Sequence, residues 1–94
     1  MGRPDDSVTR ALASLDEAGR LLSQDRNAVY GDALADFERI GQVWGALLGR
    51  EPLAAHTVGA MLAGMKLVRG QISPGHGDSW VDAAAYCALA WGCV

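Results

Sequence analysis

Residues 76–86 read HGDSWVDAAAY, and residues 30–40 read YGDALADFERI. Each stretch places Gly-Asp-x-x-x-Asp ahead of apolar residues that recur every three to four positions, which is the spacing of an amphipathic helix. An aspartate just before such a pattern is a preferred helix N-cap. Both stretches therefore predict the start of a helix, and they raise the question of whether their four aspartates also form a charged site.

Two further helices are expected from the same periodicity. Residues 8–24 carry valine and leucine at spacings of three, four and seven, behind acidic and serine residues suited to capping. A third pattern follows Pro52, runs to about Arg69 and is apolar nearly all round, which is typical of a helix at the centre of a bundle. The residues expected in its core are Val58, Met61, Leu62, Met65 and Val68.

The predicted fold is therefore all-α, a compact bundle of about four helices in one domain over residues 1–94, with residues 1–6 as a flexible N-terminus. A chain of 94 residues buries only a modest share of its surface on folding. We accordingly expect a homo-oligomer. Trp44, Trp80 and Trp91 lie at helical spacing and are expected in the core or at a subunit interface.

Composition excludes several classes of function. Eleven acidic against eight basic residues give a net charge of −3, so no basic surface for duplex nucleic acid or an anionic membrane is expected. The uncharged stretch at residues 52–65 is too short to span a bilayer. Cys87 and Cys93 do not have the spacing of zinc ligands and are interpreted as thiols in a reducing compartment. We expect a cytoplasmic protein.

Lys66 and Arg69 are the only Lys or Arg residues between Pro52 and Gly77, and they lie three apart on one helical face. One interpretation is that both extend to water from the last turn and complement the helix dipole. The other is that at least one of them contacts a phosphate or a carboxylate across the bundle.

The aspartates also allow two interpretations. Asp32 and Asp78 are suited to capping, whereas Asp36 and Asp82 lie one turn further in, where aspartate is a poor helix former. If the two helix starts lie at neighbouring ends, the four carboxylates converge, and oxygen ligands of this kind suit Mg²⁺ or Mn²⁺. The alternative is two solvated helix starts without a site.

Three further side chains lie close to these aspartates in sequence. His76 precedes Asp78 in a loop, Tyr30 precedes Asp32, and Tyr86 follows Asp82 by four residues. With Lys66 and Arg69, they are the candidates for contacts to phosphate or nucleotide.

The order of these motifs resembles a small family of uncharacterised phage and prophage proteins over about residues 26–91. The resemblance is carried by Tyr30-Gly31-Asp32, Phe37, Ile40, Trp44, Lys66, Arg69, His76, Asp78, Trp80, Asp82 and Tyr86. That family is distantly similar to MazG-like all-α nucleoside triphosphate pyrophosphohydrolases, in which acidic residues from two helices hold Mg²⁺. The resemblance implies that Asp32, Asp36, Asp78 and Asp82 are metal ligands and that Lys66 and Arg69 contact phosphate. The enzymes usually show ExxE and ExxD, whereas both pairs here are aspartates four apart.

The leading functional hypothesis is a phage-type nucleotide-handling protein in the host cytoplasm, with Mg²⁺-dependent hydrolysis of nucleoside triphosphates as its catalytic form. A second hypothesis is a helical oligomer that binds and sequesters a nucleotide without turnover, which the missing glutamates favour. A third is a structural or protein-interaction module in which the aspartates only begin helices.

Overall fold

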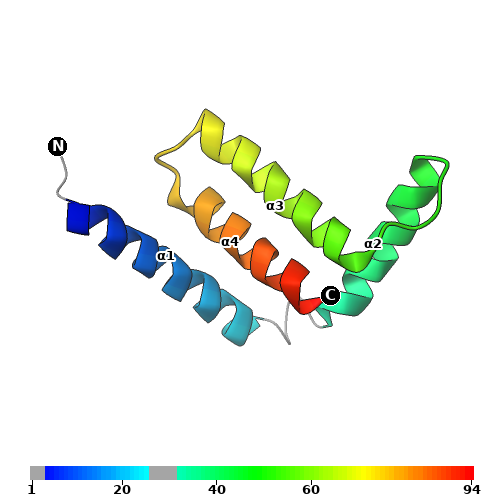
Figure 1. Ribbon diagram of the computed structural model, residues 1–94, viewed down its shortest axis with the longest axis horizontal. Coiled ribbons are helices and arrows are strands. Elements are labelled where there is room, and N and C mark those ends of the chain that lie inside the picture. Colours follow the sequence, from blue (N-terminus) through cyan, green and yellow to red (C-terminus); the bar gives the residue numbers. More distant parts are fainter. Residues whose placement is uncertain (1–3, 26–31) are drawn as a thin grey trace.

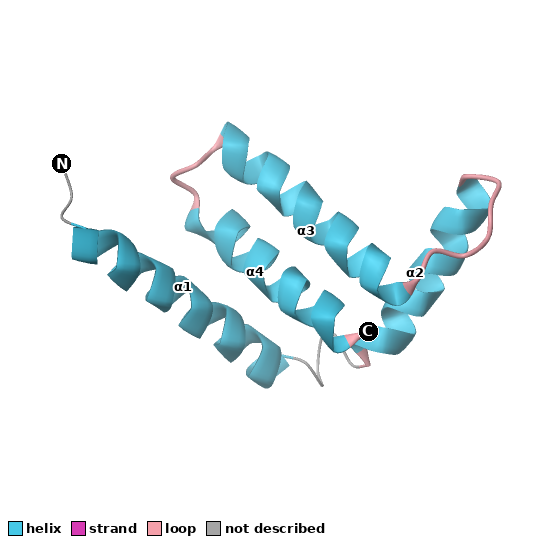
Figure 2. Ribbon diagram, in the orientation of Figure 1, coloured by secondary structure: helices cyan, strands magenta, loops and turns pink. Residues whose placement is uncertain are grey.

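The computed structural model describes residues 4–25 and 32–94, and these residues form four α-helices. The helices are α1 (Pro4–Asp25), α2 (Ala33–Leu47), α3 (Ala55–Ile72) and α4 (Gly77–Gly92). No strand occurs within the described ranges, as the helical and loop colours of Figure 2 show. The predicted all-α bundle of about four helices is confirmed.

Local sequence explains where the helices begin and end. Asp32 caps α2, because its Oδ1 accepts a hydrogen bond from the backbone N–H of Ala35 at 3.3 Å. The turn after α2 contains Gly49 at φ 69°, a backbone conformation that glycine adopts without strain. α1 begins at Pro4, inside the stretch that was expected to be a flexible N-terminus, and residues 1–3 lie outside the described part of the chain.

α4 is the central helix of the bundle. It packs most extensively against α3 and also packs against α1, while α2 packs against α3 (Figure 1). Figure 1 shows α1, α4 and α3 side by side, with α2 crossing at the end of the layer where α4 finishes. The short loop at residues 73–76 makes α3 and α4 antiparallel.

The core lies where α2 meets α3 and the C-terminal half of α4. Phe37, Ala55 and Val58 form a buried cluster, and Val58 is fully buried. Gly59 allows α3 and α4 to approach closely, since a Cβ there would lie 2.8 Å from the Cβ of Ala90. The partly buried hydrophobic residues packed against the cluster are Ile40, Trp44, Leu53, Leu62, Tyr86, Leu89 and Cys93.

The core prediction for α3 is partly wrong. Val58 is buried as expected, but Met61, Met65 and Val68 remain 46, 45 and 59% exposed. They lie on the side of α3 that faces no other described helix, because the central position belongs to α4. Trp44 packs on the core as expected, whereas Trp91 is 78% exposed.

No helix in the described ranges is both long enough and apolar enough to cross a membrane.

Candidate functional site: a polar cavity between α3 and α4

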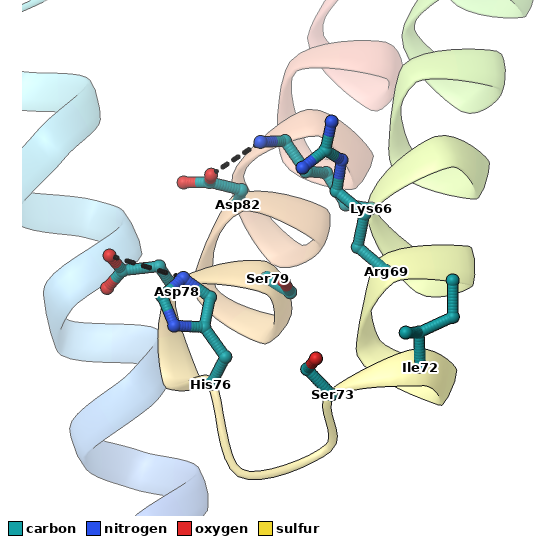
Figure 3. Close-up of a pocket in the computed structure, with 8 residues that line it drawn as sticks. All are labelled: Lys66, Arg69, Ile72, Ser73, His76, Asp78, Ser79 and Asp82. Atoms are coloured by element: carbon teal, nitrogen blue, oxygen red, sulfur yellow. Dashed lines mark ion pairs between the residues drawn. The ribbon is translucent and has the colours of Figure 1, made fainter.

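A cavity of about 510 Å³ opens between the C-terminal half of α3 and the first turns of α4 (Figure 3). Its walls combine two cationic side chains, two carboxylates, a histidine and two hydroxyl groups with one aliphatic residue. These residues are Lys66, Arg69, Ile72, Ser73, His76, Asp78, Ser79 and Asp82. Helical spacing explains the wall on α3, where Lys66, Arg69 and Ser73 follow one another at intervals of three and four residues.

The loop that closes the cavity is fastened to both helices. The indole Nε1 of Trp80 donates a hydrogen bond to the carbonyl oxygen of Pro74 at 3.0 Å. The ring of Trp80 also lies over Gly70, where an added Cβ would meet it at 3.0 Å. The backbone N–H of Ser73 donates to the carbonyl of Arg69, and that of His76 donates to the carbonyl of Ser73. The end of the cavity is therefore set by backbone and indole contacts.

Lys66 and Asp82 form an ion pair across the two helices, with 2.9 Å between Nζ and Oδ2. Their side chains are 22% and 34% exposed, so the pair is partly shielded from water. Partial shielding strengthens the attraction relative to a fully exposed pair. Of the two interpretations of Lys66 and Arg69, contact with a carboxylate across the bundle is thus confirmed for Lys66.

Arg69 differs from Lys66 in having no ion pair within residues 4–25 and 32–94. It is exposed, and Figure 3 shows its side chain rising from α3 on the same side of the helix as Lys66. The guanidinium group therefore keeps its donors available to a ligand in the cavity.

His76 and Asp78 lie at the rim. The His76 Nε2 and Asp78 Oδ2 atoms are 3.9 Å apart, with side chains 64% and 85% exposed. A contact of this length between solvated groups adds little to stability. Both side chains are consequently free to turn toward a bound molecule.

A second, smaller cavity of about 220 Å³ lies on the other side of the Lys66–Asp82 pair, between α4 and α1. Tyr86 lines it together with Leu21 and Leu22 of α1. Tyr86 also packs against the core cluster. It therefore lies beside the ion pair, but not in the wall of the larger cavity.

Asp32 and Asp36 lie elsewhere. Burial raises the pKa of the Cys93 thiol, and the nearby carboxylates of Asp32 and Glu38 raise it further, which places Asp32 beside the C-terminal end of α4. Asp78 lies fifteen residues before Cys93, which is roughly 22 Å along a helix that rises 1.5 Å per residue. Asp36 forms an exposed ion pair with Arg39 at 3.2 Å.

The expected convergence of four carboxylates is corrected by this placement. α2 docks at the end of α4 where that helix finishes, so the two Gly-Asp-x-x-x-Asp starts lie at opposite ends of α4. Across the described ranges, no group of three or more His, Cys, Asp or Glu side chains is placed to hold a metal ion. Of the four aspartates, Asp78 and Asp82 line the cavity.

Tyr30 lies outside the described residues. Ser73, Ser79 and Ile72 line the cavity without having been predicted as site residues. Ser79 is only 5% exposed and faces α3 between Asp78 and Asp82. Its position three residues before Asp82 was the sequence signal that could have pointed to it.

Comparison with known proteins gives one family. Residues 13–93 match the family described as "Domain of unknown function (DUF6378)". No curated protein and no solved structure matches the chain. Because the match covers most of the chain, the protein belongs to this family, DUF6378.

Proposed function

We propose that the protein binds a nucleotide, or a related small molecule that carries phosphate, in the cavity between α3 and α4. The observation that carries this proposal is the presence of Lys66 and Arg69 on one wall of a cavity of about 510 Å³. Small-molecule sites in proteins commonly occupy roughly 300 to 1,000 Å³. A phosphate chain is the ligand chemistry that two neighbouring cations favour.

The two cations offer different contacts. Arg69 presents a planar guanidinium that can donate two hydrogen bonds to one phosphate group. Because it has no ion pair in the described residues, no ion pair is broken when it does so. Lys66 is held in place by Asp82, so its ammonium is positioned before a ligand arrives.

Hydroxyl and imidazole groups complete the polar lining. The Ser73 and Ser79 hydroxyls and the His76 ring can donate hydrogen bonds to phosphate or sugar oxygens. The N-terminus of α4 borders the cavity, and its N-cap residue, His76, makes no side-chain capping hydrogen bond. A helix N-terminus carries partial positive charge, which adds to the attraction for an anion.

Asp78 and Asp82 are the carboxylates available to a metal ion at this cavity. Mg²⁺ is commonly bound by one or two carboxylates, waters and the phosphates of a ligand. A Mg²⁺ or Mn²⁺ ion that accompanies a nucleotide would thus meet these two aspartates without Asp32 and Asp36. Asp82 would then exchange its contact with Lys66 for the metal, which leaves Lys66 free for phosphate.

Binding, rather than turnover, is the form of nucleotide handling that this geometry supports best. The more specific hypothesis, a phage-type, MazG-like pyrophosphohydrolase, requires acidic residues from two helices around the metal. A single chain brings two aspartates of one helix to the cavity and keeps the other pair beyond the far end of α4. The partners proposed are therefore a nucleotide and further copies of the same chain.

The proposal is tested by thermal unfolding with nucleoside mono-, di- and triphosphates and cyclic dinucleotides, each with and without Mg²⁺. A ligand present at a hundred times its Kd stabilises the folded state by about 2.7 kcal/mol. Arg69→Gln should remove most of the rise in Tm, whereas Arg50→Gln, in the exposed loop after α2, should leave it intact. A panel without any ligand-dependent rise would refute the proposal.

A further inference from the structure

One side of the helix layer is apolar, and we call it the tryptophan face. On α4 it consists of the row Trp80, Ala84, Cys87 and Trp91, spaced by four, three and four residues. On α1 it consists of the row Val8, Leu12, Leu15 and Gly19, with the same spacing. Neither row contains a charged side chain, and residues 83–94 are free of Asp, Glu, Lys and Arg altogether.

The tryptophan face lies opposite the polar cavity. Trp80 and Asp82 are two residues apart on α4, so their side chains leave the helix about 200° apart. Asp82 points toward Lys66, and Tyr86 and Leu89 line the smaller cavity on that same side with Leu21 and Leu22 of α1. The Trp91 row therefore emerges from the other side of the layer that Figure 1 shows.

The rows on α1 and α4 are neighbours and form one continuous surface. Gly19 ends the row on α1, and it lines a shallow, largely apolar hollow of about 330 Å³ together with Ala88 and Gly92 of α4. Ala88 is exposed and lies three residues before Trp91 on the helix surface. The leucine row of α1 thus continues into the tryptophan row of α4.

The large side chains of this face are open to solvent. Val8, Leu12 and Leu15 are 58, 58 and 61% exposed, and Trp91 is 78% exposed. Single exposed apolar residues are ordinary on protein surfaces, but a contiguous apolar surface of this kind marks an interaction site.

The chain exposes more surface than a compact monomer of the same mass. A compact monomer of 9.9 kDa exposes roughly 5,200 Å². This chain exposes 6587 Å², an excess of roughly 1,400 Å². Its radius of gyration of 15.0 Å likewise exceeds the roughly 12 Å of a compact domain of this length. The excess is larger than the roughly 800 Å² that each partner buries in an ordinary stable interface.

We propose that the tryptophan face is covered by a second copy of this chain, packed face to face about a two-fold axis. Domains are built from packed layers, and α1, α4 and α3 form a layer with only α2 lying across one end. A second copy supplies a matching layer, with the same helix spacing and the same uncharged row on its central helix. Trp91 and Leu12 of each copy then bury against the partner.

The cavity opens on the other side of α4, so a second copy on this face leaves the cavity accessible. The test is sedimentation equilibrium of the whole chain between about 1 and 100 µM, with Leu12→Glu and Trp91→Glu as interface variants. Leu47→Glu is the matched control, because Leu47 is 79% exposed near the end of α2 and lies outside the face. Circular dichroism checks that each variant retains its helices.

The wild-type chain and Leu47→Glu should be dimeric in the upper part of this range. Leu12→Glu and Trp91→Glu should raise the dimer dissociation constant at least tenfold while leaving helicity unchanged. A wild-type chain that stays monomeric throughout would overturn the proposal, whether or not another protein or a lipid vesicle binds the face. Interface variants that dissociate no more readily than Leu47→Glu would overturn it equally. If an interface variant loses its helices, the milder Leu15→Ser change must still weaken the dimer for the proposal to stand.

Discussion

Lys66 of α3 and Asp82 of α4 form a 2.9 Å ion pair, and both residues line the cavity between α3 and α4 as well as the smaller cavity beside α1. The pair ties together the two helices that pack most extensively, and it also holds the cation that is proposed to meet phosphate. Stability and ligand binding should therefore respond differently when each partner is changed.

Removing the Asp82 carboxylate should weaken nucleotide binding less than removing the Lys66 ammonium. Asp82→Asn and Lys66→Met are each expected to lower the free energy of unfolding by roughly 1 to 2 kcal/mol, between the values for exposed and buried pairs. Lys66→Met should also weaken nucleotide binding, whereas Asp82→Asn should preserve metal-free binding. Urea denaturation and ligand titration of both variants measure the two effects. Equal loss of binding in both variants would contradict the assignment of Lys66 as the phosphate contact.

A double-mutant cycle isolates the ion pair itself. The Lys66→Met/Asp82→Asn variant should lose less stability than the two single changes added together, because each single change leaves the other group without its partner. A coupling energy of roughly 0.5 to 2 kcal/mol is expected from urea denaturation of the four proteins. Strict additivity would show that the pair contributes nothing.

Two glycines of α3 should respond to alanine with opposite signs. At Gly59 a new Cβ would lie 2.8 Å from the Ala90 Cβ and 3.0 Å from its Cα, so Gly59→Ala should cost roughly 1 to 3 kcal/mol. At Gly64 nothing lies within 4 Å, so Gly64→Ala should stabilise the helix by up to roughly 1 kcal/mol. Thermal and urea unfolding of the two variants compare them directly. A destabilised Gly64→Ala variant would show that this side of α3 is covered.

The two cysteines should differ in reactivity. Cys87 is exposed, whereas burial and the carboxylates of Asp32 and Glu38 raise the pKa of the Cys93 thiol. Because the thiolate is the reactive form, iodoacetamide should modify Cys87 before Cys93 in the Trp91→Glu variant, in which the proposed dimer is weakened, and Asp32→Asn in that background should speed the modification of Cys93. Peptide mass spectrometry over a time course measures both rates. An unchanged rate for Cys93 after Asp32→Asn would contradict the placement of Asp32 beside that thiol.

The raised pKa of Cys93 also predicts how stability depends on pH. The folded state holds the thiol proton more tightly than the unfolded state, so the folded protein binds more protons once the unfolded thiol ionises. The contribution is fully present below roughly pH 8.5 and is lost as pH rises through the folded-state pKa. Urea denaturation between pH 7 and 10 should show a smaller decline in Cys93→Ala than in the wild-type chain. Identical declines would exclude the effect.

Sequence periodicity predicted the helices well because each one carries its own signals. Asp32 caps the start of α2 and Gly49 follows its end, so both ends of this helix could be predicted without tertiary structure. The exposure of Met65 could not be predicted, because an apolar side chain has the same pattern whether a neighbouring helix covers it or not.

The sequence could predict only the part of the candidate site that lies on two helices joined by a short loop. Lys66, Arg69, Asp78 and Asp82 share a cavity because α3 and α4 are joined by a short loop and must pack side by side. Asp32 was misplaced because repeated motifs do not reveal helix order in space. α2 approaches the opposite end of α4, and only tertiary packing determines that choice.

The central claim, a phosphate-bearing ligand between α3 and α4, is tested most directly by nuclear magnetic resonance of ¹⁵N-labelled protein titrated with the nucleotide panel, with and without Mg²⁺. Binding in the cavity predicts concentration-dependent shifts of the backbone amides of Arg69, Ser73, His76 and Ser79, while those of α2 stay in place. No shift with any nucleotide, or shifts confined to α2, would contradict it.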